Sequence, residues 1–186
     1  MRILIDLDDT MEDLCGAWVN YLNKKHSLSV RRDDIDVWDI ASRFPTLTEE
    51  EVFAPLYRED FWETVKPVDG AVKYIRRIIE DGHDVYIVTA SHPETFGIKY
   101  RYIIKRYFPF INSKMVVSAY DKSIIRGDIL IDDGPHNFEN WRHVGILFDA
   151  PFNKSFDEKT AGIVRAKSWE EIYSYIRIFT DIINES

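Results

Sequence analysis

The sequence has little cysteine and no long apolar run. Cys15 is the only cysteine among 186 residues, so an internal disulfide cannot form and a reducing compartment is expected. It falls in a predicted helix, where a small core residue is a better interpretation than a nucleophile. No apolar run approaches the roughly 18 residues of a membrane span. The chain enters a strand pattern at once, which leaves no room for a signal peptide, so we expect a cytoplasmic protein without a membrane partner.

Positive charge is also scarce. The chain has 24 Lys and Arg against 32 Asp and Glu, a net charge of −8. A protein that binds the backbone of a polynucleotide needs a basic face, so we expect no polynucleotide partner. A small anionic substrate remains compatible with this charge, because a bound divalent cation can reverse the local field.

Short apolar runs predict the strands of a sheet. They are rich in Ile, Val and Leu without strict alternation, which is typical of strands covered on both faces. The runs are Arg2–Asp6, Val85–Ala90, Met115–Ser118, Ile129–Asp132 and Val144–Asp149. Helical patterns separate most of them, and this alternation predicts an α/β fold with a doubly wound parallel sheet.

The helical patterns carry recognisable ends. For the helix around Ile75, we predict Asp69 as the N-cap and Gly82 as the residue that follows its C-terminus. Another helix is expected before Pro109, along the face of Ile98 and Tyr102. The last helix opens with a capping box, Ser168-Trp169-Glu170-Glu171.

Residues 27–66 interrupt the alternation of strands and helices. They contain a second capping box, Thr48-Glu49-Glu50-Glu51, and no apolar run that resembles a sheet strand. We interpret this segment as a small, mostly helical cap inserted into a core formed by residues 1–26 and 67–186. Most of its aromatic side chains are expected to form its own core, with one or two lining a pocket: Trp38, Phe44, Phe53, Tyr57, Phe61 and Trp62.

Polar side chains gather where the predicted strands end. The first strand runs into Asp6-Leu7-Asp8-Asp9-Thr10, and others are followed by Thr89-Ala90-Ser91, Lys122 and Asp132-Asp133. The carboxyl ends of strands form the ligand crevice of open α/β sheets. Grouped carboxylates repel one another unless a cation or a phosphoryl-transfer site organises them.

This set of groups matches the needs of phosphoryl transfer through an aspartyl-phosphate. It supplies a carboxylate nucleophile, a second carboxylate two residues later, hydroxyl groups, a lysine and an acidic pair. The charge on the phosphoryl oxygens requires a cation and fixed donors, which a metal ion, Lys122 and Thr89 could provide. Mg²⁺ suits hard carboxylate and carbonyl oxygens.

The motifs resemble those of a known superfamily. Asp6-Leu7-Asp8-Asp9-Thr10 resembles the DxDx[TV] signature of haloacid dehalogenase (HAD) phosphatases, and Thr89, Lys122 and Asp132-Asp133 resemble the next motifs in the same order. Longer blocks resemble the 5′(3′)-deoxyribonucleotidase family. They are Phe61-Trp62-Glu63 through Pro67-Val68-Asp69-Gly70-Ala71, Asp84–Thr89, Asp121-Lys122-Ser123 and Asp128 through Pro135. The resemblance covers nearly the whole chain and is weakest in the insertion.

The resemblance implies roles for these residues. Asp6 would be the nucleophile, and Asp8 the acid that protonates the leaving oxygen and then the base that activates water. Thr89, Lys122 and the backbone near Ser91 would hold the phosphoryl oxygens. Metal ligands would be Asp6, the Asp8 carbonyl and Asp133, with Asp132 acting directly, through water or behind the ligands. Trp38 would stack on a base.

Two positions depart from the family pattern. Family members commonly have a small residue, often Gly, where this chain has Asp9, which we interpret as solvent-facing or as a cap at the start of a helix. An Arg often follows the acidic pair, where this chain has Gly134 with His136 nearby. These differences concern base and sugar preference rather than the phosphatase chemistry.

Three functions remain open from the sequence. The first is a Mg²⁺-dependent phosphatase of (deoxy)ribonucleoside monophosphates, with pyrimidine 5′(3′)-deoxynucleotides preferred. The second is a superfamily phosphatase for another small phosphometabolite. The third is a non-catalytic domain that accepts a phosphoryl group, although such a domain has no need of Asp8. A small-molecule nucleotide is the expected partner, and a homodimer is left open.

Overall fold

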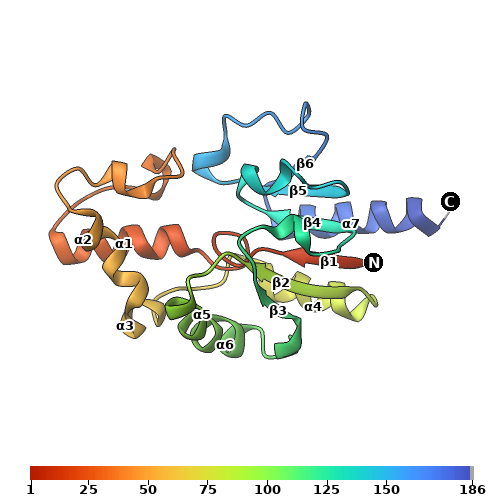
Figure 1. The fold of residues 1–186 in the computed structure, drawn as a ribbon, viewed down its shortest axis with the longest axis horizontal. Coiled ribbons are helices and arrows are strands. Elements are labelled where there is room, and N and C mark those ends of the chain that lie inside the picture. Colours follow the sequence, from red (N-terminus) through yellow and green to blue (C-terminus); the bar gives the residue numbers. More distant parts are fainter. Residues whose placement is uncertain (185–186) are drawn as a thin grey trace.

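The computed structural model describes residues 1–184, in which short strands alternate with helices (Figure 1). The strands are β1 (Arg2–Ile5), β2 (Asp84–Thr89), β3 (Val116–Ser118), β4 (Ile129–Asp132), β5 (Val144–Phe148) and β6 (Val164–Ala166). The α-helices are α1 (Leu14–His26), α2 (Glu49–Phe53), α3 (Glu59–Trp62), α4 (Ala71–Glu80), α5 (Pro93–Lys99), α6 (Lys105–Tyr107) and α7 (Trp169–Asn184). None of these helices is long and apolar enough to cross a membrane.

The strands form one sheet in the order β3-β2-β1-β4-β5-β6. Every pairing between these described strands is parallel, which confirms the predicted α/β architecture. Strand β1 lies at the centre, with Ile5 between Ile87 and Ile131. The sequence analysis did not find β6, because a three-residue edge strand carries too short a pattern to recognise.

The two faces of the sheet are covered differently. Alternate strand residues point to opposite sides, so Ile3 and Ile5 join the large core under the helices, where Ile75 and Ile176 pack. Each such fully buried side chain contributes about 1.5–3 kcal/mol to stability. Residues of the other face, Leu4 among them, pack in a smaller cluster against loops and short turns. Long helices therefore cover one face only.

The helix ends follow the predicted capping rules with one exception. Thr48 and Glu51 form the reciprocal capping box at the start of α2, and Gly82 follows α4 with φ of 88°. The prediction that Asp69 caps α4 is wrong, because Gly70 occupies that position with φ of 80°. A Cβ on Gly70 would lie 3.3 Å from Cβ of Trp169, so close packing against the start of α7 favours glycine there.

The segment between α1 and α4 holds helices α2 and α3 and three short 3-10 turns, and no strand is described within it. It lies beyond the end of the sheet at which β1 runs into α1 (Figure 1). Its aromatic side chains divide into two sets. Phe44, Phe61 and Trp62 are buried, whereas Trp38, Tyr57 and Phe53 are exposed, at 60%, 53% and 37%.

Candidate active site

Polar side chains from four strand ends converge at one edge of the sheet. Asp6 directly follows β1, and its N–H donates to the carbonyl of Ile131 at 2.9 Å. Thr89 and Asp132 are the last residues of β2 and β4. Lys122 opens the 3-10 turn that follows β3. Parallel pairing in register thus brings together residues that are far apart in the sequence.

Lys122 joins two of the carboxylates. Its Nζ donates to Asp6 and to Asp132, and its side chain is only 2% exposed. Burial opposes its charge, but the carboxylates of Asp132 and Asp6 outweigh burial and raise the pKa of Lys122, so the side chain is a fixed cation. The other oxygen of Asp132 accepts from Gly134 N at 2.8 Å and from Asn137 Nδ2 at 2.9 Å. Protein donors therefore reach both oxygens of Asp132.

Three buried carboxylates form a cluster that can bind a metal ion. Asp6, Asp132 and Asp133 each place an oxygen within 4.8 Å of the others. Burial raises the pKa of Asp6 to about 7, although the charge of Lys122 acts against that shift. Burial, together with the charges of Asp6 and Asp132, also raises the pKa of Asp133. A divalent cation would favour the ionised form of these groups, and their hard oxygens suit one.

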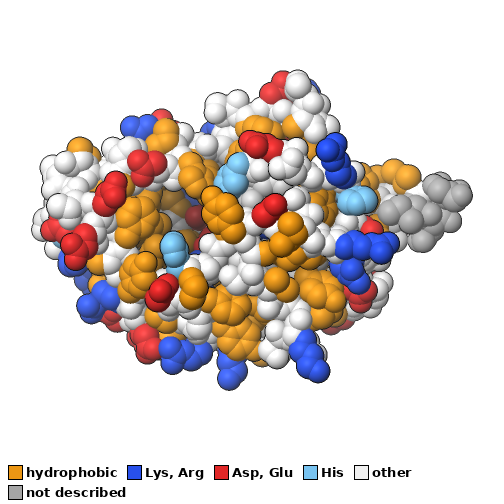
Figure 2. Space-filling model, viewed as in Figure 1, with side chains coloured by type: hydrophobic (Ala, Val, Ile, Leu, Met, Phe, Trp, Pro, Cys, Tyr) orange, Lys and Arg blue, Asp and Glu red, His pale blue; other side chains and the backbone are white. Residues whose placement is uncertain are grey.

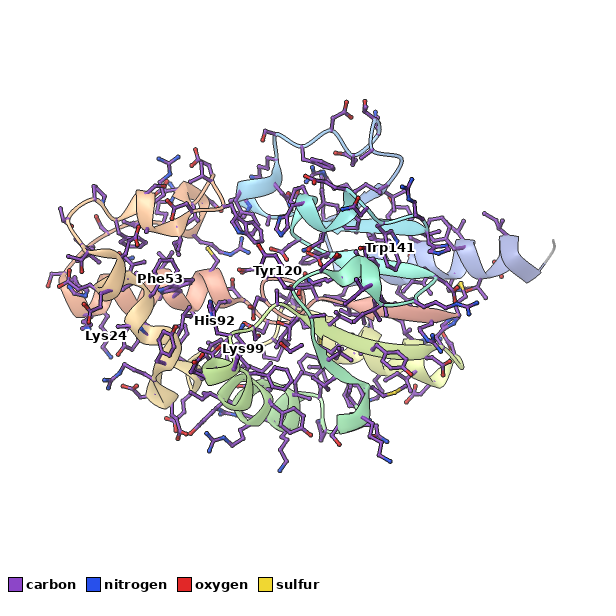
Figure 3. The ribbon with its side chains drawn as sticks, in the orientation of Figure 1. Lys24, Phe53, His92, Lys99, Tyr120 and Trp141 are labelled. Carbon is purple, nitrogen blue, oxygen red and sulfur yellow. The ribbon has the colours of Figure 1, made fainter. Side chains whose placement is uncertain are left out.

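Asp8 has contacts that the sequence analysis missed. Lys99 is the last residue of α5 (Figure 3). It is only 5% exposed, yet it forms an ion pair with Oδ2 of Asp8. The spacing of the helix could have indicated this contact. Thr95, Lys99 and Ile103 follow one another at intervals of four residues, and all three are buried. A lysine within such a stripe needs a buried partner.

Glu12 is the second residue beside Asp8 that sequence reasoning missed. It is fully buried, and neither of its oxygens, nor Oδ1 of Asp8, has a hydrogen-bond partner among the described residues. Burial raises the pKa of Glu12 well above its usual range, and the charge of Asp8 raises it further. No periodic pattern points to Glu12, because it lies in a loop.

Asp9 supports the start of the first helix, whose N-cap residue is Asp13. Its backbone is left-handed, with φ of 51°, and its carboxylate accepts from the N–H of Cys15 at 3.0 Å. The guanidinium of Arg32, from the insertion, lies 3.8 Å from the same carboxylate and donates to Asp13 at 2.9 Å. Asp9 is therefore buried rather than solvent-facing, and it accepts a hydrogen bond from the first turn of α1 beside the N-cap Asp13. Cys15 is buried in the core as expected, and burial raises the pKa of its thiol to about 12.

Two hydroxyl groups complete the inner edge of the site. Oγ1 of Thr89 and Oγ of Ser91 are 2.9 Å apart, and the Ser91 carbonyl accepts from the Ser118 hydroxyl at 3.2 Å. Oγ1 of Thr10 donates to Asp133 at 3.3 Å. The hydroxyls of Thr89 and Ser91 thus lie together at the end of β2.

The molecular surface is hollowed between the insertion and the sheet, with acidic side chains at the bottom of the hollow (Figure 2). Phe53, His92 and Tyr120 lie around it (Figure 3). Trp38 is 60% exposed and meets the His136 and Phe152 rings edge-on, at 4.8 and 5.2 Å between centroids. The insertion thereby contacts the loop that follows the acidic pair.

Gly134 fills a crowded position in that loop. A Cβ there would lie 2.8 Å from Cε1 of His136 and 3.2 Å from Oδ1 of Asp132. A larger residue would therefore displace the His136 ring, on which Trp38 packs. The departure from the family pattern at Gly134 and the placement of Trp38 are thus linked by packing.

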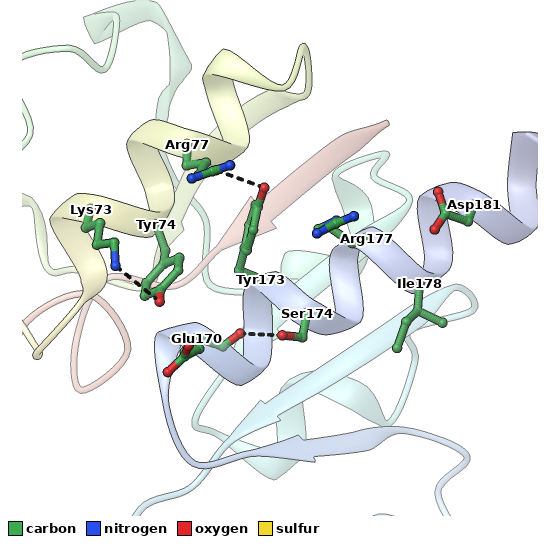
Figure 4. Close-up of a pocket in the computed structure, with 9 residues that line it drawn as sticks. All are labelled: Lys73, Tyr74, Arg77, Glu170, Tyr173, Ser174, Arg177, Ile178 and Asp181. Atoms are coloured by element: carbon green, nitrogen blue, oxygen red, sulfur yellow. Dashed lines mark hydrogen bonds between the residues drawn. The ribbon is translucent and has the colours of Figure 1, made fainter.

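A separate groove of about 490 Å³ lies between α4 and α7 (Figure 4). Two of its cations donate to tyrosines, Arg77 Nε to Tyr173 at 3.1 Å and Lys73 to Tyr74 at 3.4 Å. None of the clustered carboxylates described above lines it. The groove is therefore distinct from the candidate active site.

Comparison with known proteins decides the family. The model of the 5′ nucleotidase, deoxy (pyrimidine), cytosolic type C family matches residues 1–181. The chain belongs to this family. A 5′(3′)-deoxyribonucleotidase of Bacillus subtilis is 34% identical over 172 residues, which cover 91% of this chain and 95% of that protein. One of Clostridium acetobutylicum is 31% identical over 182 residues, 96% of each chain.

Solved structures support the same fold for this nucleotidase. A haloacid dehalogenase-like hydrolase of Streptococcus pneumoniae superposes with a TM-score of 0.64 at 14% identity, covering 94% of this chain and 97% of that one. A haloacid dehalogenase-like protein of Agrobacterium tumefaciens gives 0.63 at 12% identity, covering 96% and 98%. The expected HAD-like fold and nucleotidase family are both confirmed. The protein is a hydrolase of phosphoric monoesters.

Proposed function

We propose that this enzyme hydrolyses (deoxy)ribonucleoside monophosphates, pyrimidine 5′(3′)-deoxynucleotides above all, through an aspartyl-phosphate on Asp6. The observation that carries the proposal is the pairing of the two carboxylates with separate lysines. Asp6 is bound to Lys122, and Asp8 is bound to Lys99. The relatives named 5′(3′)-deoxyribonucleotidase support the substrate class.

The proposed reaction has two steps. An oxygen of Asp6 attacks phosphorus, the bond to the nucleoside oxygen breaks, and Asp8 gives a proton to that oxygen. Asp8 then takes a proton from a water molecule that attacks the same phosphorus, which releases phosphate and restores Asp6. Lys122, Thr89 and Ser91 hold the phosphoryl oxygens and offset their charge throughout.

Mg²⁺ is the proposed metal ion. Asp6, Asp133 and the Asp8 carbonyl would bind it, because these are hard oxygen donors. Asp132 would act through water or from behind the ligands, since Lys122, Gly134 and Asn137 already donate to its oxygens. When bound, the ion neutralises charge on the carboxylates and on the phosphoryl group.

The insertion would select the substrate. We divide the chain into a catalytic core of residues 1–26 and 67–186 and a helical cap of residues 27–66, with Trp38 of the cap stacking on the base. The exposed Trp38 ring beside the acidic edge favours a planar base over a sugar phosphate. The alternative, a phosphatase for another small phosphometabolite, would need a polar pocket there. Because the protein is a hydrolase, we discard the third hypothesis, a non-catalytic domain that only accepts a phosphoryl group.

A substrate panel tests this function. Nucleoside 5′- and 3′-monophosphates and sugar phosphates would be assayed for phosphate release with Mg²⁺ and with a chelator. We expect turnover of dUMP and dTMP above that of sugar phosphates, and loss of turnover without the metal ion. Equal turnover of dUMP, dTMP and sugar phosphates would contradict a nucleotidase. Cytoplasmic location and a homodimer remain predictions, and light scattering in solution tests the second.

A further inference from the structure

The backbone carbonyls that follow the paired parts of β4 and β5 are joined by one side chain. The register between the two strands ends at Asp132 and Leu147, and the next residues are Asp133 and Phe148. Beyond the last pair, a carbonyl loses its partner on the neighbouring strand, and a buried carbonyl then needs another donor. The amide of Asn153 supplies it, because its Nδ2 donates to the carbonyls of Asp133 and Phe148, both at 2.8 Å.

Asn153 is a fully satisfied buried amide. It is 1% exposed and is the last residue of the 3-10 turn Pro151–Asn153. Its Oδ1 accepts from Ala150 N at 3.1 Å and from the guanidinium of Arg165 at 2.7 Å. An amide has two N–H donors and an oxygen with two lone pairs, so the side chain uses all four of its hydrogen-bonding positions. Two acceptors on one side and two donors on the other also fix the orientation of the amide.

Arg165 of β6 holds Asn153 in place. Its side chain is 13% exposed, and besides Oδ1 it donates to the backbone carbonyl of Asn153 at 3.1 Å. It also forms ion pairs with Asp149 and Glu158, at 2.8 and 3.1 Å. A guanidinium has a rigid fork of donors, so acceptors bound to several of them have little freedom to move. A chain of contacts thus leads from β6 through Asn153 to Asp133.

Asp133 belongs to the buried acidic cluster, together with Asp6 and Asp132. Asn153 donates to its backbone carbonyl, and Oγ1 of Thr10 donates to its carboxylate at 3.3 Å. The backbone and the side chain of Asp133 are therefore each held by a hydrogen bond from another segment. Contacts of this kind orient the ligands of a metal ion, and their loss typically weakens metal binding by about 10- to 100-fold.

Asp133 depends on such support more than the other two carboxylates do. Among the described residues, Lys122 donates to Asp6 and to Asp132, and no ion pair with a cationic side chain is formed by Asp133. Like charges at close range favour a movement of the carboxylate away from its neighbours. The contact from Asn153 opposes that movement, because it fixes the backbone from which the side chain of Asp133 extends.

We propose that Asn153 is a positioning residue for Asp133: its amide fixes the Asp133 backbone so that the carboxylate faces the acidic cluster and can bind a divalent cation. This inference rests on the proposed function, in which Asp133 is a ligand of Mg²⁺. Because Asn153 acts only through Asp133, its loss weakens the binding of the ion and leaves the chemistry intact once the ion is bound.

A Mg²⁺ titration of the metal-free, full-length enzyme tests the proposal, measured by calorimetry without substrate. Asn153→Asp keeps the oxygen that Ala150 and Arg165 use and removes both N–H donors. Its Kd for Mg²⁺ should rise about tenfold. The added negative charge would by itself tighten the binding of a cation, so a weaker affinity cannot come from charge. Phosphate release from a deoxynucleoside monophosphate should fall at low Mg²⁺ and return to within about threefold of the wild type at saturating Mg²⁺.

Asn23→Asp is the matched control. Nδ2 of Asn23 donates to the carbonyl of Val30 at 2.7 Å, and its Oδ1 accepts from the Val30 N–H at 3.0 Å. The substitution therefore adds the same charge and removes a donor from a backbone carbonyl, but it does so in α1, without a contact to the acidic cluster. Its Kd for Mg²⁺ should stay within about twofold of the wild type, because distant sites act independently.

The outcomes separate this inference from the proposed function. Unchanged Mg²⁺ affinity in folded Asn153→Asp overturns the positioning role, and so does an equal weakening in Asn153→Asp and Asn23→Asp. If Asn153→Asp does not fold, Asn153→Ser decides, because its hydroxyl adds no charge and has one donor for two carbonyls: a raised Kd supports the proposal and an unchanged Kd overturns it. Wild-type Mg²⁺ affinity in Asp133→Asn contradicts the metal site of the proposed function. Loss of affinity there, beside unchanged affinity in Asn153→Asp, contradicts only the inference.

Discussion

Asp9 occupies a backbone conformation that most side chains avoid. Its φ of 51° lies in the left-handed region, where an L-residue is strained by roughly 1–2 kcal/mol. Asp tolerates this region better than larger residues, and here its carboxylate is bound by the N–H of Cys15. The side chain that made the acidic cluster conspicuous accepts a hydrogen bond from the first turn of α1, next to the N-cap Asp13.

The pH dependence of stability should reflect Asp9. Burial raises its pKa from 3.8 to about 7, against the hydrogen bond from Cys15 and the charge of Arg32. The folded state therefore holds a proton that the unfolded state loses, so stability is greatest below pH 4 for this group and declines as pH rises toward 7. Asp9→Asn keeps the backbone preference and the accepting oxygen but cannot ionise. In metal-free protein, we expect the urea concentration at the unfolding midpoint to fall less in Asp9→Asn than in the wild type as pH rises from 4 to 7.

The control for this comparison is Asp60→Asn, which changes an exposed carboxyl group. It should leave the change of the urea midpoint between pH 5 and 8 as in the wild type, because Arg58 lowers the pKa of Asp60 and the group is ionised there in both the folded and unfolded states. The Asn variant at position 9 should retain part of the slope, because Asp6 also has a pKa raised to about 7 and contributes with the same sign. A slope equal to that of the wild type would show that Asp9 does not titrate in the folded state as expected.

Among single substitutions, Asp6→Asn should cause the largest loss of activity. Asp6→Asn keeps the size of the side chain but removes the nucleophile, so kcat should fall by at least about 10⁴-fold. The fold should survive, because an amide can still accept from Lys122 and relieves repulsion with Asp133. Phosphate release and circular dichroism check the two parts. Substantial turnover in a folded Asp6→Asn enzyme would refute covalent catalysis through this residue.

Helices α4 and α7 depend on a close approach at one glycine. Gly70 has φ of 80°, and a Cβ there would lie 3.2 Å from the Tyr74 ring and 3.3 Å from Cβ of Trp169. Gly82, at the other end of α4, has a similar φ of 88° but nothing within 4 Å. The two positions therefore share backbone strain and differ in packing, which makes them a matched pair.

Alanine substitutions separate these two effects. Gly82→Ala should cost about 1 kcal/mol of unfolding free energy from backbone strain alone. Gly70→Ala should cost about 1 kcal/mol more, because neighbours of the added Cβ must also shift. Gly97→Ala, in α5 with open space around it, should instead stabilise by about 0.5–1 kcal/mol. Urea unfolding measures all three, and equal losses at Gly70 and Gly82 would show that packing at α7 is not tight.

The helical segment around Lys99 has an irregularity that the hydrophobic pattern of the sequence does not predict. The face of Ile98 and Tyr102 correctly predicts helix before Pro109, but the structure divides it into α5, a π-helical turn and α6. Periodicity assumes a constant 3.6 residues per turn, so it cannot register one wider turn. That irregularity follows directly after the buried lysine that contacts Asp8.

At the scale of the whole molecule, the segment between α1 and α4 lies next to the sheet edge that carries the acidic side chains. Trp38 of the insertion contacts His136 and Phe152 of the core, so this contact joins the two parts beside the site. Trp38→Ala should raise KM for deoxynucleoside monophosphates about tenfold, since stacking on a base contributes about 1–3 kcal/mol. It should leave KM for a sugar phosphate nearly unchanged. Tyr57→Ala, at another exposed aromatic of the insertion, is the control, and an equal rise for both substrates would contradict stacking.

The sequence by itself determined the strands, the sheet class and the chemistry at the strand ends. These are local properties, because apolar runs and short motifs such as Asp6 to Thr10 are contiguous in the chain. Only the tertiary structure decided the surroundings of Asp8. Lys99 lies 91 positions away from it in sequence, and Glu12 lies in a loop without periodicity. Contacts of this kind depend on how distant segments pack, and no local pattern encodes that.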